Sequence, residues 1–228
     1  MRLLLLRHGQ TTANVTGALD TAFPGRPLTD LGRAQAAAVP EALAAEDVTA
    51  LYASNLTRTR RTAEPLRAAR GLSVGIRPSL AEISAGAVEM RSDEEAVQAY
   101  VDTLVAWMSG DLGRPVPGRP DGPDGHAFWA RYDGALDTIA ERHRGQTVAV
   151  FSHGAAIRVW TVVTAGLTRD EAERAHISNT GMVVLERRTG GGWDLESWTS
   201  DPVGGSHLLD TGARDVTGES VDDVADDR

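Results

Sequence analysis

The fold of this chain is decided by residues 2–9, which read RLLLLRHG. The apolar run is only four leucines long, far too short for the core of a signal peptide or for a membrane span. A short apolar run that ends at polar residues and a glycine is instead typical of a buried strand. We therefore expect a central strand over residues 2–6, with Arg7 and His8 at its carboxyl end.

Further apolar segments alternate with amphipathic ones along the rest of the chain. Strands are predicted over residues 48–53, 73–76, 147–151, 182–185 and 193–198, the last two joined by a glycine hairpin. Helices are predicted from a cap at Thr29 or Asp30 to Val39, from Ser54 or Asn55 onwards, over 93–109, along a face formed by Phe128, Tyr132, Leu136 and Ile139, and from 154 to about Ala165. This alternation predicts an α/β fold of three layers, α/β/α, with a mostly parallel central sheet.

Composition narrows the class of protein. The chain of 228 residues has no cysteine, which excludes disulfides, thiolate catalysis and cysteine-ligated metals, and a cytoplasmic location is expected. The net charge is −9 and there is no basic block, so neither nucleic acid nor a membrane is an expected partner.

Residues 210–228 hold seven acids and two arginines. We expect them to form a disordered acidic tail after a single domain over residues 1–209.

Two histidine motifs share one form. His8 and His153 each follow an apolar strand, and each is followed by a glycine. In a parallel sheet the carboxyl ends of the strands lie at one edge, where ligands bind. Glycine lets the backbone approach a ligand, and a following helix directs free N–H groups at an anion. The two motifs therefore predict one anion-binding site that contains both histidines.

Four blocks of the sequence resemble the signature of the histidine phosphatase superfamily, the phosphoglycerate-mutase-like enzymes. They are Arg7-His8-Gly9-Gln10-Thr11 with Asn14, residues 54–63 (SNLTRTRRTA), Leu80-Ala81-Glu82, and Ser152-His153-Gly154. Their order and spacing agree with the family over about residues 2–200. The resemblance implies a phosphoglycerate-mutase-like fold with a small cap insertion at about residues 84–125.

The resemblance also implies a role for each matching residue. His8 would be the nucleophile and accept the phosphoryl group, and Glu82 would protonate the leaving oxygen. Arg7, Arg58 and His153 would hold the phosphate oxygens. The implied catalytic set is His8, Glu82, His153, Arg7 and Arg58, and the implied phosphate- and substrate-binding set is Arg7, Gln10, Asn14, Arg58, His153 and Gly154.

Elementary chemistry agrees with these roles. The transition state of phosphoryl transfer spreads its negative charge over the phosphoryl oxygens. Fixed cationic donors therefore supply most of the stabilisation of this transition state. Arginine offers planar paired donors that stay charged. Imidazole, with an unperturbed pKa of ~6.5, is a competent nucleophile near neutral pH. An alkoxide is a poor leaving group and needs an acid. This chemistry requires no metal or other cofactor, and the resemblance implies a metal-independent phosphomonoesterase similar to the histidine acid phosphatases.

Glu89 is a rival to Glu82 as the general acid. It lies seven residues further on, near the point where the family often has Trp-Glu-Gly. This chain has Val88-Glu89-Met90 there instead, a departure that would alter the wall of the pocket. The sequence leaves the choice between the two acids open.

Three functions remain in competition. The first is a phosphatase for a small phosphorylated metabolite, the second a cofactor-dependent phosphoglycerate mutase, and the third a phospho-ligand binding protein without turnover. Residues 84–125 hold eight acids and only three arginines, a poor setting for bisphosphoglycerate, which favours the phosphatase. The edge strand predicted over residues 193–198 is a place where a second copy of the chain could form a homodimer.

Overall fold

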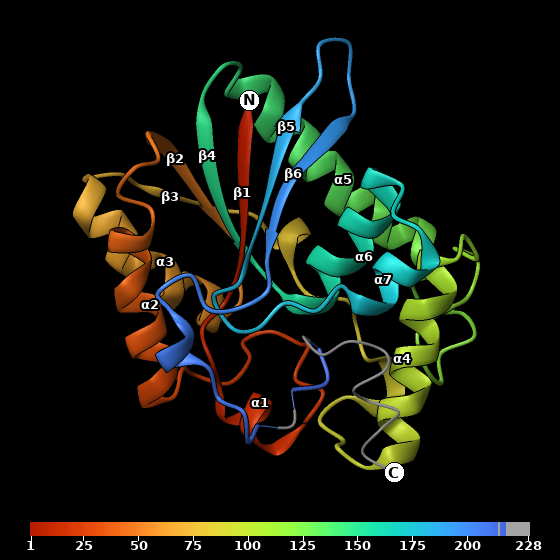
Figure 1. Cartoon of the computed structure of the whole chain (residues 1–228). Helices are drawn as coiled ribbons and strands as arrows, with labels where there is room; N and C mark the ends of the chain where they lie inside the picture. The colour runs from red at the N-terminus through yellow and green to blue at the C-terminus, as the bar shows by residue number, and fades with distance from the viewer. Residues whose placement is uncertain (214, 218–228) are drawn as a thin grey trace.

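Six strands form one sheet in the computed structural model, which describes residues 1–213 and 215–217. The strand order is β3-β2-β4-β1-β5-β6 (Figure 1). Neighbours from β3 to β1 pair in parallel, whereas β5 and β6 add an antiparallel pair. The mostly parallel sheet and the late hairpin are thus confirmed. The strands are β1 (Arg2–Arg7), β2 (Val48–Ala53), β3 (Val74–Ile76), β4 (Thr147–Ser152), β5 (Met182–Arg187) and β6 (Trp193–Thr199).

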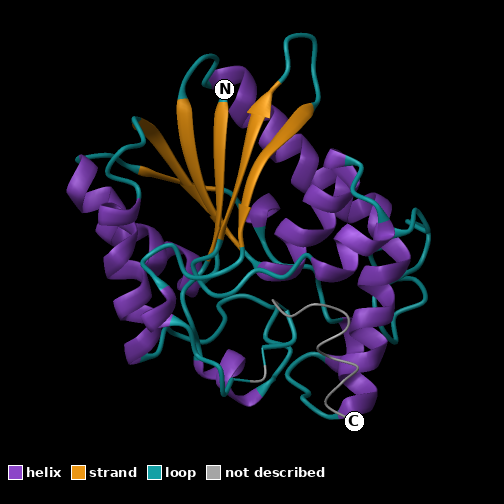
Figure 2. Ribbon diagram, viewed as in Figure 1, coloured by secondary structure: helices purple, strands orange, loops and turns teal. Residues whose placement is uncertain are grey.

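Helices cover both faces of the sheet, as Figure 2 shows. One face packs against α2 and α3, the other packs against α5 and α6, and α4 lies against α6. The three-layer prediction is therefore confirmed. The α-helices are α1 (Thr12–Thr16), α2 (Asp30–Ala42), α3 (Thr57–Arg70), α4 (Glu94–Met108), α5 (Gly125–Arg142), α6 (Gly154–Ala165) and α7 (Arg169–Arg174), with 3-10 turns at Pro78–Leu80, Gly86–Val88 and Ser206–Leu208. No helix in the described part of the chain is long and apolar enough to cross a membrane.

The leucines of β1 serve both layers of the core. Leu3 and Leu5 belong to the core cluster that contains residues of α4, α5 and α6, whereas Leu4 and Leu6 belong to the cluster with residues of α2 and α3. This division follows from the alternation of side chains along a strand. All four leucines are 0 % exposed, and burying each contributes roughly 1.5–3 kcal/mol. β1 is consequently held at the centre of the sheet. The residues that follow β1 leave the sheet beside the residues that follow its neighbour β4.

The helix starts were predicted with mixed success. Thr29 caps α2 by accepting a hydrogen bond from the N–H of Gly32, as expected. The predicted cap of α3 at Ser54 or Asn55 is wrong, because the helix begins at Thr57. The hydroxyl of Ser54 is engaged instead with His153. The sequence reading also missed α1 and α7, two short helices of which each has a capping box.

The first residues of the predicted acidic tail contact the body of the domain. Asp210 accepts a hydrogen bond from Nε2 of Gln10 at 2.7 Å, and Asp215 forms an ion pair with Arg7. These contacts fix part of the segment against the body of the domain. Residues 214 and 218–228 of the predicted tail lie outside the described residues.

Candidate active site

His8 and His153 meet at the carboxyl edge of the sheet. Residues 7 and 152 are partners in the parallel pairing of β1 with β4, so the next residue of each strand leaves the sheet at the same level. The centroids of the two imidazole rings lie 5.3 Å apart. Both side chains are buried. The two histidines thus lie together as the sequence predicts, while the anion-binding site and their chemical roles stay predictions.

The ring of His8 is held in one tautomer. Its Nδ1 lies 2.8 Å from the carbonyl oxygen of Gly9. A carbonyl can only accept a hydrogen bond, so Nδ1 carries the proton and Nε2 keeps a lone pair. Burial, reinforced by the charges of Arg58 and Arg7, lowers the pKa of His8 well below its ordinary value. The shift favours the neutral form of the His8 imidazole.

His153 has both ring nitrogens engaged with protein groups. Nε of Arg58 donates to Nδ1 at 3.2 Å, and Nε2 lies 2.7 Å from the hydroxyl of Ser54. Because Arg58 is a donor, Nε2 carries the proton and donates to Ser54. Burial, followed by the charge of Arg58, lowers the pKa of His153 well below its ordinary value. The role of this imidazole as a phosphate donor therefore stays a prediction.

Arg58 projects from the first turn of α3 towards the loop before α2. Its Nη1 forms an ion pair with Asp20 at 3.2 Å, and its Nη2 donates to the Asp20 carbonyl at 2.9 Å. Gly25 has φ +73°, and a Cβ at this glycine would lie 2.4 Å from Nη1 of Arg58. Glycine is therefore required where the loop passes the guanidinium. Together these contacts fix the direction of Arg58.

Arg7 and Asn14, two predicted phosphate ligands, are bridged by a carboxylate. Nη1 and Nη2 of Arg7 each lie 2.6 Å from an oxygen of Asp215. Nδ2 of Asn14 donates to the same carboxylate at 2.8 Å. The sequence reading missed Asp215, because nothing in its local pattern separates it from the other acids of the predicted tail.

Glu82 is buried against the first turn of α6. Its Oε1 accepts from the N–H groups of Ile83 and Ala156, both at 2.9 Å, and Oε2 accepts from Ala155 at 3.3 Å. Burial raises the pKa of Glu82, although the hydrogen bonds and nearby arginines oppose the shift. A raised pKa suits a carboxyl group that has to donate a proton.

Glu89 is committed to the loop after α1. Oε1 accepts from the N–H groups of Thr21 and Ala22 at 2.8 and 2.9 Å, and Oε2 contacts the Thr21 hydroxyl. The side chain is half-buried, less than that of Glu82. These contacts show that Glu89 holds the loop that carries Asp20, while the choice of Glu82 as the acid stays a prediction.

The remaining predicted site residues also lie at this edge. The amide of Gln10 donates to Asp210 at 2.7 Å and accepts from Thr29 at 2.8 Å, so both of its ends are engaged with protein. A Cβ at Gly154 would lie 2.4 Å from the carbonyl oxygen of Thr217. Gly154 thus makes room for the C-terminal segment.

Two supporting residues were not predicted. The hydroxyl of Thr62 accepts from the N–H of Gly9 at 2.9 Å, and the amide of Asn179 donates to the carbonyl of His8 at 3.1 Å. A small cavity at the site is lined by His8, Thr11, Ala13, Asn14, Gly17, Ala18, Asp20, Arg58 and residues 215–217. Among the described residues, no group of three or more histidines or acids is placed to hold a metal ion.

The chain belongs to the histidine phosphatase superfamily (branch 1), whose family model matches residues 3–201. A curated relative, the PE-PGRS family protein PE_PGRS11 of Mycobacterium tuberculosis, is 34 % identical over 220 residues, which are 89 % of this chain and 37 % of that protein. The chain thus spans little more than a third of that relative. The probable phosphoglycerate mutase GpmB of Cronobacter sakazakii is 29 % identical over 94 % of this chain and 98 % of its own length.

Solved structures share the fold. The mycobacterial glucosyl-3-phosphoglycerate phosphatase, solved in complex with VO3, superposes with a TM-score of 0.73 at 23 % identity and covers 88 % of this chain and 99 % of its own. The alpha-ribazole phosphatase of Shigella flexneri superposes with a TM-score of 0.69 at 26 % identity, covering 88 % and 96 %. The phosphoglycerate-mutase-like fold implied by the sequence is therefore confirmed.

Proposed function

We propose that the chain is a phosphomonoesterase that hydrolyses a small phosphorylated metabolite through a covalent phosphohistidine at His8. The observation that carries this proposal is the orientation of His8. Its Nδ1 is held by the Gly9 carbonyl at 2.8 Å, and the ring lines a cavity together with Asn14 and Arg58. The free lone pair of Nε2 is thus next to groups that would hold a phosphate.

The proposed reaction has two steps. Nε2 of His8 attacks phosphorus while the ester P–O bond breaks, and Glu82 gives its proton to the leaving oxygen. Glu82, now a carboxylate, then takes a proton from a water molecule whose oxygen attacks phosphorus. The P–N bond breaks, inorganic phosphate leaves, and His8 returns as a neutral imidazole. Arg7 and Arg58 stabilise the charge on the phosphoryl oxygens in both steps.

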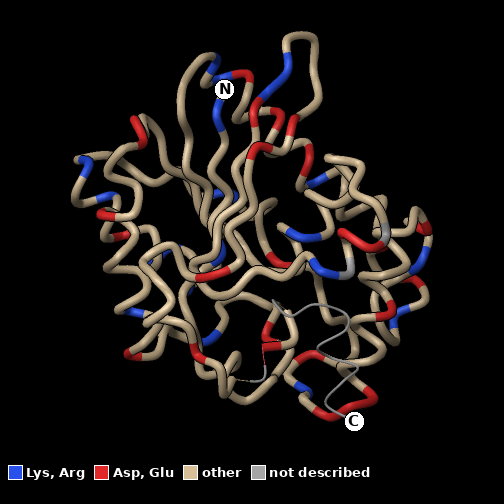
Figure 3. The backbone as a smooth tube through the Cα atoms, in the orientation of Figure 1, with Lys and Arg blue, Asp and Glu red and all other residues tan. Residues whose placement is uncertain are grey.

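A cofactor-dependent phosphoglycerate mutase is the second candidate, and the name of the GpmB relative favours it. The charge of the cap segment argues against it. Residues 84–125 carry eight acids and three arginines, and Figure 3 marks acidic residues at the amino-terminal end of α4. Such a segment would repel a substrate or cofactor with several negative charges. The solved alpha-ribazole phosphatase, 26 % identical, supports the phosphatase instead.

The deciding experiment measures phosphate release without added metal, from a panel of phosphorylated metabolites and an aryl phosphate. The wild type and His8→Ala are assayed in parallel, and 3-phosphoglycerate is included with and without bisphosphoglycerate. Release that disappears in His8→Ala is the expected result. Bisphosphoglycerate-dependent isomerisation without release would establish the mutase. If the chain binds phosphorylated ligands but shows neither phosphate release nor isomerisation, it would be a phospho-ligand binding protein without turnover.

A further inference from the structure

The C-terminal segment places a carboxylate in the phosphate site of the proposed function. Asp215 is 208 residues distant in sequence from Arg7, yet each of its oxygens lies 2.6 Å from a terminal nitrogen of that arginine. The same carboxylate accepts from Asn14 at 2.8 Å. This paired geometry is the one by which arginine binds either a carboxylate or a phosphate. Asp215 thus holds two groups that the substrate phosphate would need.

Arg7 has no terminal N–H group left for a substrate while this contact persists. A guanidinium has two hydrogens on each terminal nitrogen and one on Nε. Nη1 bonds the carbonyl of Ile177 and Asp215, and Nη2 bonds Asp215 and the hydroxyl of Thr217. The remaining group, Nε, is buried without a partner in the described structure. A phosphate oxygen can therefore bind the terminal nitrogens of Arg7 only if the carboxylate withdraws.

The segment that carries Asp215 has a defined place on the domain. Val216 is 9 % exposed and belongs to the same core cluster as Leu3 and Leu5. The carbonyl of Thr217 lies against Gly154, where a Cβ would lie only 2.4 Å away. A segment packed in this way holds its carboxylate at a high local concentration beside Arg7, as a tethered ligand does.

We propose that Asp215 is an intramolecular ligand of the phosphate site, which a phosphorylated substrate has to displace. This inference rests on the proposed function, because it takes Arg7 and Asn14 as phosphate ligands. A tethered competitor weakens the binding of every anion that uses the same groups, and it does so by one common factor. It should therefore raise the KM for a phosphomonoester and the Kd for inorganic phosphate equally. Its benefit to turnover would be easier release of the product phosphate.

The test compares the wild-type chain with Asp215→Asn and Asp215→Ala. The matched control is Asp201→Asn, which also removes one negative charge but at an exposed position outside the site. Calorimetry gives the Kd for inorganic phosphate, steady-state assays with an aryl phosphate give KM, and thermal unfolding checks the fold of each variant. We expect both Asp215 variants to lower Kd and KM by the same factor of about tenfold, the effect of one charge-assisted hydrogen bond. The control should change neither.

Unchanged or weaker phosphate binding in folded Asp215 variants would overturn the inference, and would make Asp215 a permanent support for Arg7. A crystal structure with bound phosphate gives a second check. The Arg7–Asp215 ion pair should be broken there, and an intact pair beside the phosphate would also overturn the inference. Phosphate binding needs no turnover, so tighter binding without ester hydrolysis would refute only the proposed function. Hydrolysis with unchanged Kd and KM would refute only the role of Asp215.

Discussion

Nε of Arg58 donates a hydrogen bond to Nδ1 of His153 at 3.2 Å, joining the first turn of α3 to the start of α6. The remaining nitrogens of Arg58 are directed to Asp20. One guanidinium thus connects an imidazole of the site with the loop that lines its cavity. Such a double contact requires the planar, branched shape of arginine and not its charge alone.

Replacing Arg58 by lysine should therefore be costly although the charge is kept. An ammonium group cannot contact His153 and Asp20 in the same geometry, and it loses the paired contact to a phosphate. We expect Arg58→Lys to lower kcat/KM for an aryl phosphate by about a hundredfold. Arg60→Lys, on the exposed side of the same helix, serves as the control. Equal effects of the two substitutions would argue against the role given to Arg58.

Substitution of the general acid should depend on the leaving group. Glu82→Gln removes the proton donor, and the rate for alkyl phosphates should fall by about a hundredfold or more. Aryl phosphates with good leaving groups depend less on a proton donor, so their rate of hydrolysis should fall much less. Glu89→Gln is the matched comparison, because Glu89 holds the loop at Thr21. If Glu89→Gln shows the stronger dependence on the leaving group, the assignment of the acid is wrong.

The two pKa shifts predict a bell-shaped pH profile for kcat/KM. Burial, with Arg58 and Arg7, lowers the pKa of His8, so the nucleophile should stay neutral below its usual pKa of ~6.5 and be lost only in more acidic solution. Burial raises the pKa of Glu82, so the acid keeps its proton above the usual ~4.3 and loses it as the pH rises through the raised value. The activity left in Glu82→Gln should lack the alkaline limb, which a pH titration of initial rates checks.

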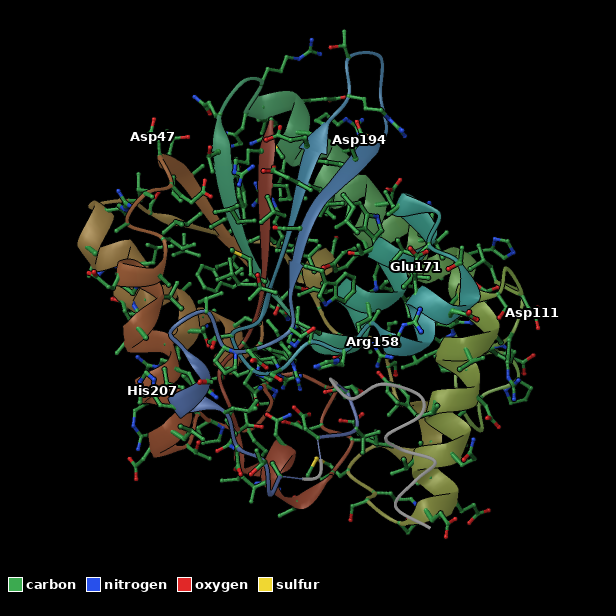
Figure 4. All side chains as sticks on the ribbon, in the orientation of Figure 1. Asp47, Asp111, Arg158, Glu171, Asp194 and His207 are labelled. Atoms are coloured by element: carbon green, nitrogen blue, oxygen red, sulfur yellow. The ribbon has the colours of Figure 1, made fainter. Side chains whose placement is uncertain are left out.

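Arg158 is a buried cation whose replacement should stabilise the fold. It is 4 % exposed, and its Nε and Nη2 have no hydrogen-bond partner in the described structure. Burial, followed by the charge of Arg7, lowers its pKa to about 10, so it is still charged at neutral pH. Arg158 belongs to α6 and is labelled in Figure 4. Arg158→Met should raise the free energy of unfolding by about 1–4 kcal/mol, because a flexible apolar chain replaces a buried guanidinium with two nitrogens that lack hydrogen-bond partners in the described structure.

Denaturation measures the free energy of unfolding of Arg158→Met, and a variant of Arg131 provides the contrast. Its guanidinium donates to the carbonyls of Ser79, Ala81 and Glu82 at 2.7–2.8 Å. Arg131→Met should lower the free energy of unfolding by about 1–3 kcal/mol, since these carbonyls lose their donors. A loss of stability in Arg158→Met as large as that in Arg131→Met would contradict the view that burying the Arg158 guanidinium costs more than its contacts return.

Much of the site could be predicted because its chemistry lies in short segments of sequence. His8 and His153 each follow an apolar strand and precede a glycine, and parallel pairing of two such strands necessarily brings their ends together. The cap of α3 shows the opposite case. Ser54 has the composition of an N-cap residue, but its hydroxyl lies 2.7 Å from Nε2 of His153. A contact between residues 99 positions apart overrides a local preference.

By itself the sequence determined the layered α/β fold and the edge of the sheet at which the chemistry lies. Strand alternation and the four motif blocks are local patterns, and each acts within a few residues of itself. Only the tertiary structure decided which ring nitrogen of His8 is free and that Asp215 pairs with Arg7. Proton positions and ion pairs depend on burial and on atoms brought within hydrogen-bond distance. Those distances arise from packing the whole chain and leave no trace in the spacing of the residues involved.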